Sequence, residues 1–222
     1  MFELMVYFLL FIIYSFIGWL TEIICIMITA KRFSNRGFLI GPYCPIYGFS
    51  ALIIITNLNK YYNDPLALFI FIVIVASIME YLTSYLMENI FNARWWDYSN
   101  KPFNINGRIC LSNALLFGIM GLILVYILNP FISHLLFKAN ETLIIYLGII
   151  IFIIFIFDVI TSFNIISKIE LTINEIRKDY TDEINNIVKS ILLQKSFLTK
   201  RLIKAFPNFK SINKTIKNKI NN

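Results

Sequence analysis

The chain has 222 residues, of which 58% are hydrophobic and 15% are charged, and its formal net charge is +7. Soluble domains are roughly 45–50% apolar and about 25% charged, so the composition excludes an ordinary soluble domain and favours a protein that faces lipid. The single histidine, His134, excludes Ser-His-Asp, Cys-His and multi-histidine metal chemistry. We therefore expect no metal or other cofactor. No GxxxxGK[ST] phosphate loop occurs, so the chain cannot itself drive transport with ATP.

Apolar segments long enough to cross a bilayer recur five times along the chain. A helix needs about 20 apolar residues to cross roughly 30 Å of hydrocarbon. The predicted spans are residues 4–29, 44–58, 66–90, 109–128 and 142–166. The first lacks a basic leader and is too long for a cleaved signal peptide. The pattern predicts an all-α integral membrane protein with a five-helix transmembrane bundle over residues 1–167, and His134 is expected in an outer loop.

The distribution of basic residues predicts the orientation of this bundle. Of the 20 lysines and arginines, 18 fall in alternate loops or after position 167, and only two fall on the other side. The larger set comprises Lys31, Arg32, Arg36, Arg94, Lys101, Arg108 and twelve later residues, and the smaller set is Lys60 and Lys138. By the positive-inside rule, the N-terminus lies outside and the C-terminus inside.

Four carboxylates fall within the predicted spans: Glu22, Glu80, Glu88 and Asp158. A charge at the bilayer centre costs about 2.5–3.5 kcal/mol on insertion scales, so these residues need a reason to be there. Helical rise puts Glu22 and Asp158 about 12 Å from the cytoplasmic ends of their helices, with Glu80 deeper and Glu88 near the surface. The second and fourth spans add polar residues at this level. We therefore expect a polar cavity that opens to the cytoplasm, with Glu22 and Glu80 as candidate proton carriers or bases.

Two interpretations of these polar groups remain open. They bind a ligand or take part in a reaction, or they pair with one another and hold the helices together. In the second case Glu22 or Glu80 would bond to Arg36, Arg94 or Arg108, each hydrogen bond contributing about 1–2 kcal/mol.

Two loops on the predicted cytoplasmic side carry further candidates. Residues 35–48 contain three glycines and two prolines within an apolar stretch, and broken backbone at membrane depth is tolerated only where it is buried or lines a wet cavity. Cys44 in this loop has no histidine to activate it, so we expect a packed thiol. Residues 92–110 combine Trp95 and Trp96, typical interfacial anchors, with arginines that could clamp a phosphate or carboxylate. The candidate ligand-binding residues are Arg36, Tyr47, Glu88, Arg94, Trp96, Asp97, Asn106, Arg108, Asn113 and Asp158.

The C-terminal region has a different pattern. Apolar residues at 169, 173, 176, 180, 184, 187 and 191 follow helical spacing and predict a cytoplasmic amphipathic helix over residues 168–206. Charges from 195 to 219 are uniformly positive, which favours contact with an anionic inner leaflet over nucleic acid. Residues 207–222 are predicted to be a basic, disordered tail.

Several motifs together resemble a known family. They are Gly18-Trp19 with Glu22, Arg36-Gly37-Phe38, the run from Gly41 to Gly48, Met79-Glu80, the run from Trp95 to Ser99, and the run from Asn106 to Cys110. In this order, over roughly residues 8–165, they resemble the ABC-transporter type IV family of CmpB-like bacterial membrane proteins. The resemblance implies a multi-pass protein of the bacterial plasma membrane with a permease label, but it brings no defined activity.

Three functions are consistent with the sequence. The first is a permease-like protein that binds or moves a small polar or amphiphilic ligand. Five spans without an internal repeat make a poor transporter unless the chain forms a homodimer, and a separate ATPase subunit is the other partner that this function suggests. The second is an intramembrane enzyme with a glutamate base and an arginine clamp, acting on a lipid or isoprenoid head group. The third is a non-catalytic membrane scaffold. The expected partners are the lipid bilayer and either a lipid or a small molecule, without nucleic acid.

Overall fold

The computed structural model describes residues 1–31, 37–91, 93–179 and 210–211 and is mainly helical. The helices are α1 (Phe2–Ala30), α2 (Pro45–Asn57), the 3-10 helix η1 (Asn59–Tyr61), α3 (Pro65–Phe91), α4 (Leu111–Ile123), the π-helix η2 (Leu124–Leu128), α5 (Asn129–Lys138) and α6 (Glu141–Asp179). Two small antiparallel pairs join β1 (Ala93–Arg94) to β4 (Lys210–Ser211) and β2 (Asn104–Ile105) to β3 (Ile109–Cys110). The predicted amphipathic helix begins within α6. The rest of it, and all but two residues of the predicted tail, lie outside the described residues.

Four helical segments of the described chain are long and apolar enough to cross a membrane: Phe2–Ile28, Pro65–Phe91, Leu111–Lys138 and Glu141–Ile165. The chain is therefore a multi-pass helical membrane protein. α2, which occupies the predicted second span, has 13 residues. At 1.5 Å per residue it is about 20 Å long, too short to cross the hydrocarbon by itself.

The fourth span is longer than predicted. The sequence prediction ended it at residue 128, before Asn129-Pro130, but the helix continues through η2 and α5 to Lys138. Proline is tolerated here because it occupies the first turn of α5, directly after the wider turn of the π-helix. His134 consequently lies on an exposed position of α5, not in a loop as expected.

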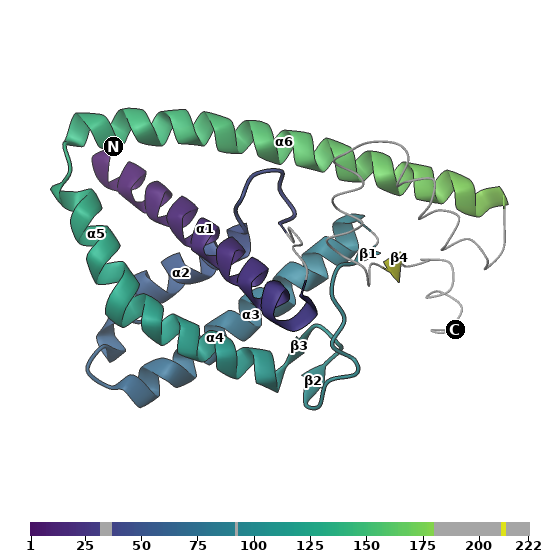
Figure 1. Ribbon diagram of the computed structural model, residues 1–222, viewed down its shortest axis with the longest axis horizontal. Coiled ribbons are helices and arrows are strands. Elements are labelled where there is room, and N and C mark those ends of the chain that lie inside the picture. Colours follow the sequence, from purple (N-terminus) through teal and green to yellow (C-terminus); the bar gives the residue numbers. More distant parts are fainter. Residues whose placement is uncertain (32–36, 92, 180–209, 212–222) are drawn as a thin grey trace.

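The helices form a bundle in which α1 is central (Figure 1). α1 contacts α2, α5 and α6, while α3 packs against α4 and also contacts α2 and α6. α4, η2 and α5 rise to meet the start of α6, and α6 turns back alongside α1. Close approach of α3 and α4 depends on Gly118, because a Cβ atom there would overlap the ring of Phe69.

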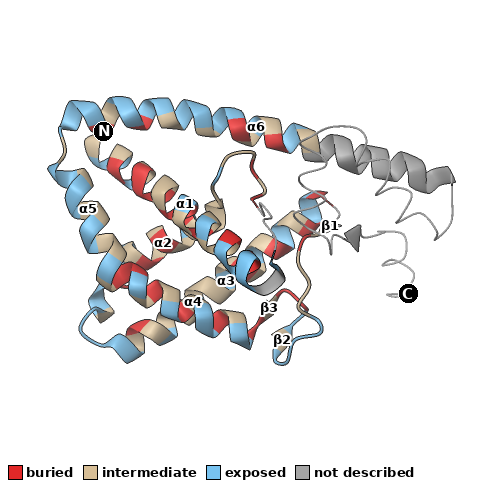
Figure 2. Ribbon diagram, in the orientation of Figure 1, coloured by how far each residue is buried: buried red, intermediate tan, exposed pale blue. Residues whose placement is uncertain are grey.

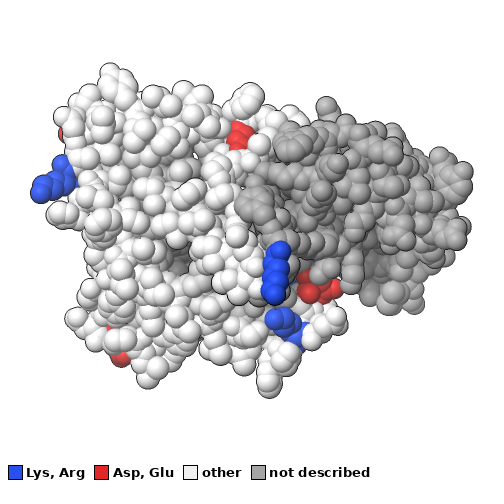
Figure 3. Space-filling view, viewed as in Figure 1, with Lys and Arg blue, Asp and Glu red and all other residues white. Residues whose placement is uncertain are grey.

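The outer surface of the bundle is apolar. Large hydrophobic side chains are exposed along every long helix, and Phe157 on α6 is 72% exposed. Figure 2 shows this exposure along α5 and α6, and the described part of the face in Figure 3 is nearly free of charge. Such a surface would aggregate in water but suits contact with acyl chains.

The interior divides into an apolar half and a polar half. The apolar core joins the first half of α1, the second half of α2, the first half of α3, η2 and the start of α6. Its fully buried members include Val6, Leu10, Leu68, Ile72 and Ile144. The buried polar residues lie near the middle of α1 and α6, in the second half of α3 and at the end of the loop before α4, namely Ser15, Glu80, Ser84, Glu88, Arg108, Asp158 and Ser162. The chain therefore concentrates its polar chemistry at one end of the bundle.

Candidate functional site

The polar half is organised around a break in the helical backbone between α1 and α2. After α1 the chain turns back, and the backbone N–H of Cys44 donates to the carbonyl of Ser15 at 2.9 Å. Ser15 lies about 20 Å along α1, near its middle. α2 therefore starts halfway along α1 and runs back toward its N-terminal end.

Small residues let α2 lie directly on α1. A Cβ atom at Gly48 would overlap Ser15, and one at Gly18 would overlap the ring of Tyr47. Residues 37–44, which are irregular, lead directly into α2.

A carboxylate on α6 satisfies the broken backbone. Asp158 accepts hydrogen bonds from the backbone N–H groups of Ile40 at 2.9 Å and Gly41 at 2.7 Å. It also accepts from the hydroxyl of Tyr43 and, at 2.9 Å, from the hydroxyl of Ser162. All four donors belong to the chain, so this geometry favours a structural role for Asp158.

Aromatic side chains pack the start of the same irregular segment. The ring of Phe38 lies 5.4 Å from Phe91, 5.8 Å from Trp95 and 5.8 Å from Phe163, measured between centroids. Trp95 is buried, so its expected role as an interfacial anchor is wrong. The cause is tertiary: the end of α3 brings Trp95 under the irregular segment and α6, where burial of its large ring outweighs exposure at the interface.

A second polar group lies between α1, α2 and α3. The hydroxyl of Tyr47 donates to Glu22 Oε1 at 2.5 Å. The hydroxyl of Tyr98, in the loop after α3, bonds to Glu80, and Glu22 interacts electrostatically with both. Burial, together with the charges of Glu80 and Glu22, raises the pKa of Tyr98 well above its usual value. Tyr98 is therefore a neutral hydrogen-bond donor at any physiological pH.

Glu80 differs from the other carboxylates of the bundle. Its side chain is 5% exposed, and its Oε2 atom is buried without a hydrogen-bond partner among the described residues. An unsatisfied buried oxygen of this kind is rare and costly, so it needs a specific explanation.

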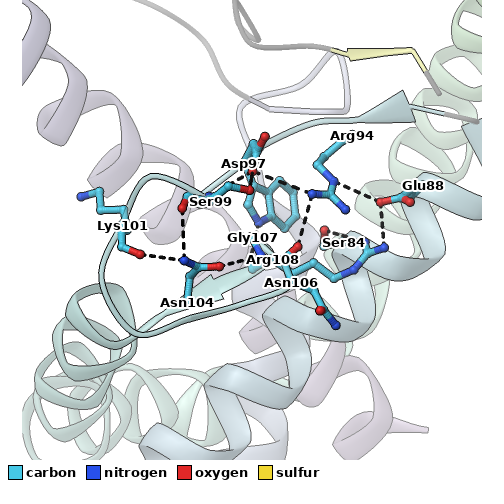
Figure 4. Close-up of polar contacts among 11 residues, drawn as sticks. Ser84, Glu88, Arg94, Asp97, Ser99, Lys101, Asn104, Asn106, Gly107 and Arg108 are labelled. Carbon is cyan, nitrogen blue, oxygen red and sulfur yellow. Dashed lines mark hydrogen bonds and ion pairs between the residues drawn. The ribbon is translucent and has the colours of Figure 1, made fainter.

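A third polar group closes the end of the bundle, where α3 meets the loop of residues 92–110 (Figure 4). Arg108 donates to Glu88 Oε2 at 2.7 Å and to the hydroxyl of Ser84 at 3.1 Å. Arg94 reaches the same Glu88 oxygen at 3.2 Å and lies 3.8 Å from Asp97. The guanidinium of Arg108 also lies 5.6 Å from each of the ring centroids of Tyr81 and Tyr85. Both arginines thus use their charge within the protein.

The loop that carries these arginines is internally hydrogen-bonded. The side chain of Asn104 accepts from the N–H of Gly107 at 3.0 Å, and Asp97 accepts from the N–H of Ser99 at 3.0 Å. Gly107 has a φ of 66°, and a Cβ atom there would overlap Ser99 and Asp97. Glycine is therefore required at this turn both by backbone conformation and by space.

The structure brings most of the predicted candidates together, but in separate groups. Glu88, Arg94, Trp96, Asp97, Asn106 and Arg108 form one network, in which Trp96 donates to the carbonyl of Arg108 at 2.9 Å and Asn106 donates to Tyr81 at 3.0 Å. Glu22, Tyr47 and Glu80 form another. Asp158 lies with the irregular segment, and Asn113 is half-buried on the first turn of α4. Arg36 lies outside the described residues.

Sequence reasoning missed several partners in these groups. They are Tyr98, next to the two tryptophans in the chain, and Tyr81 and Tyr85 on α3. Helical spacing could have found the tyrosines, because Tyr81, Ser84, Tyr85 and Glu88 share one face of α3. The approach of Tyr98 to Glu80 depends on the path of the loop, so no local pattern reveals it. Among the described residues, no group of three or more His, Cys, Asp or Glu side chains could hold a metal ion.

Fold and polar groups together define a multi-pass helical membrane protein with a polar interior at one end. A family model described as "Putative ABC-transporter type IV" matches residues 9–163, which is more than two thirds of the chain. The chain belongs to this family, as its motifs predicted, and it is a membrane protein related to transport. No curated protein and no solved structure matches it.

The ion pair of Arg108 with Glu88 should dominate the stability of this end of the bundle. Replacing Arg108 by methionine leaves a buried carboxylate without its closest cation, so we expect a loss of about 3 kcal/mol in the free energy of unfolding. Unfolding in detergent, followed by circular dichroism, measures it. Lys101→Met, an exposed position of the same loop, is the control. Adding Glu88→Gln should recover much of the loss. Equal stability of the Arg108 and Lys101 variants would mean that Arg108 is available for a ligand.

The hydrogen bonds to Asp158 should protect the irregular segment. In Asp158→Asn an amide N–H₂ replaces one acceptor oxygen and faces backbone donors, so about 2 kcal/mol of charge-assisted bonding is lost. We expect amide exchange at Ile40 and Gly41 to accelerate about thirtyfold, as measured by mass spectrometry in detergent. Asp64→Asn, an exposed capping aspartate that bonds Ala67 N–H, should leave it unchanged. Unaltered exchange in the Asp158 variant would contradict a structural role.

Proposed function

We propose that this chain is a permease-like protein of the bacterial plasma membrane, which binds or moves a small polar or amphiphilic solute through a polar site open to the cytoplasm. In this proposal the chain crosses the membrane five times, with the N-terminus outside and the C-terminus inside. Residues 37–44 and α2 together make the second crossing. Membership of the family supports a function in transport. The division of the interior into an apolar half and a polar half supports a site at the end that we propose to be cytoplasmic.

The proposal rests on a pair of carboxylates in the bundle, one of which has an oxygen atom without a hydrogen bond among the described residues. Glu22 and Glu80 come from different helices, each bonded to a tyrosine hydroxyl, and Glu80 Oε2 has no partner among the described residues. Buried intramembrane carboxylates are costly, and they typically mark solute or ion pathways. A purely structural group would be expected to satisfy all of its acceptors.

The arginines favour transport over the enzyme alternative. An enzyme acting on a phosphorylated head group would need Arg94 and Arg108 to hold the anion. Arg108 is buried against Glu88, and Arg94 is shared between Glu88 and Asp97. Moving either guanidinium to an anion would break its ion pair with Glu88, and moving both would leave this buried carboxylate uncompensated, which opposes the binding of an anion here.

Loss of the carboxylates should abolish function without loss of the protein. In a strain that requires the gene, we expect Glu22→Gln and Glu80→Gln each to prevent growth at a normal protein level, because the amide removes the charge and keeps the shape. Metabolite profiles of both variants should match that of the deletion strain. Glu3→Gln, at an exposed position of α1, is the matched control and should behave as wild type.

Two results would contradict the proposal. If both carboxylate variants support growth, the site has no role in function. If they do so while truncation at residue 168 prevents growth, the scaffold alternative is supported instead.

Labelling of single cysteines tests the proposed orientation. In a variant without Cys25, Cys44 and Cys110, cysteines placed at Lys60 and Lys138 should react with a membrane-impermeant maleimide in intact cells. A cysteine at Lys101 should react only after the cells are opened. Reaction of position 101 in intact cells would overturn the orientation, and protection of position 60 alone would mean that α2 does not complete a crossing.

A further inference from the structure

The unsatisfied oxygen of Glu80 identifies the kind of group that would complete this site. Glu80 lies on α3 below the loop of residues 92–110, and its side chain is 5% exposed. Tyr98 supplies one hydrogen bond to its carboxylate, and Oε2 lacks any within the described chain. A carboxylate oxygen can only accept hydrogen bonds or bind a cation. The missing partner is therefore a donor or a positive charge.

The charges around Glu80 favour a cation over a neutral donor as the missing partner. The ion pairs of Arg94 and Arg108 in the described part of the chain are with Glu88 and Asp97, not with Glu80. Glu80 also interacts electrostatically with Glu22, whose negative charge would repel an anion. A neutral donor would satisfy the oxygen, but the buried carboxyl group would then take up a proton, because an uncompensated buried charge is strongly unfavourable. A cation would satisfy the oxygen and also stabilise the ionised form of Glu80.

The small number of available oxygen ligands favours an ammonium group over a divalent metal ion at this site. Hard divalent cations take about six oxygen ligands, several of them carboxylates. Glu22 and Glu80 offer four carboxylate oxygens, and each residue already accepts a bond from a tyrosine hydroxyl. No metal-binding group of three or more ligands exists among the described residues. An ammonium group, in contrast, needs only a few acceptors and can bond directly to one carboxylate oxygen.

We propose that the solute of this protein carries a primary ammonium group, which Glu80 binds through Oε2 beside Glu22, Tyr47 and Tyr98. This inference rests on the proposed function and names the class of its solute. The ammonium group can belong to a free amine or to the head group of an aminophospholipid. Tyr98, in the loop after α3, already bonds to the Glu80 carboxylate and would lie beside the bound ammonium group.

The test is the thermal unfolding of the full-length protein in detergent with methylammonium chloride as the probe. We expect the unfolding midpoint to rise with methylammonium concentration, because a ligand that binds only the folded state stabilises it. Sodium chloride and sodium phosphate at equal ionic strength should give no such rise. Glu80→Gln should weaken the apparent affinity about thirtyfold or more, since a buried charge pair is lost.

Further variants separate binding from a folding defect. Glu80→Gln should be at least as stable as wild type without the probe, because the amide removes an uncompensated buried charge. Glu80→Asp keeps the charge and should retain part of the response, while Glu3→Gln should respond as wild type. Nanodiscs of phosphatidylglycerol with and without phosphatidylethanolamine identify the source. Loss of the methylammonium response only when phosphatidylethanolamine is present supports a lipid head group, and an unchanged response supports a free amine.

Several outcomes would overturn the inference. They are the absence of a methylammonium response in wild type, an equal response to sodium, or a full response in Glu80→Gln. If any of these occurs while Glu80→Gln still prevents growth, the proposed permease function stands and only the ammonium assignment fails. If Glu80→Gln also supports growth, both proposals fail together.

Discussion

Lipid offers no hydrogen-bond partners, and this constraint shapes the polar half of the protein. Residues 37–44 interrupt the helical path between α1 and α2, so their backbone groups must be satisfied by other parts of the chain. Asp158 on α6 meets the N–H groups of Ile40 and Gly41. The N–H of Cys44 donates to the carbonyl of Ser15, and α2 begins at the next residue, Pro45. Tyr47, in the first turn of α2, then reaches Glu22 on α1.

The need of buried polar groups for hydrogen-bond partners also separates the fully paired carboxylates from Glu80. Glu88, Arg94, Asp97 and Arg108 compensate each other within the loop of residues 92–110 and the end of α3. Asp158 uses both oxygens on the irregular segment. After these contacts Glu80 is the carboxylate with an oxygen left over in the described chain. The structural interpretation therefore fits the ion-pair network and Asp158, and the proposed ligand site rests on Glu80.

Two expectations from the sequence, the end of the fourth span and the interfacial position of Trp95, are wrong for physical reasons. Asn129-Pro130 resembles a helix end, but the wider turn of η2 and the first turn of α5 accommodate proline, so His134 is helical. Trp95 and Trp96 resemble interfacial anchors, yet the fold buries Trp95 among Phe38, Phe91 and Phe163. In each case a local preference was outweighed by the surroundings that the rest of the chain supplied.

The sequence by itself determined the membrane class, the family, the approximate spans and the concentration of polar residues toward one end. These follow from hydrophobicity, helical spacing and motifs, which are local properties. Only the tertiary structure decided which polar groups meet, because those contacts join residues far apart in the chain, such as Arg108 with Ser84 and Asp158 with the N–H of Gly41. It also decided that an irregular segment, residues 37–44, directly precedes the helix of the second predicted span, α2. The length of α2 could be read locally, but the carboxylate that lets the backbone stay irregular beside it lies 117 residues away from Gly41.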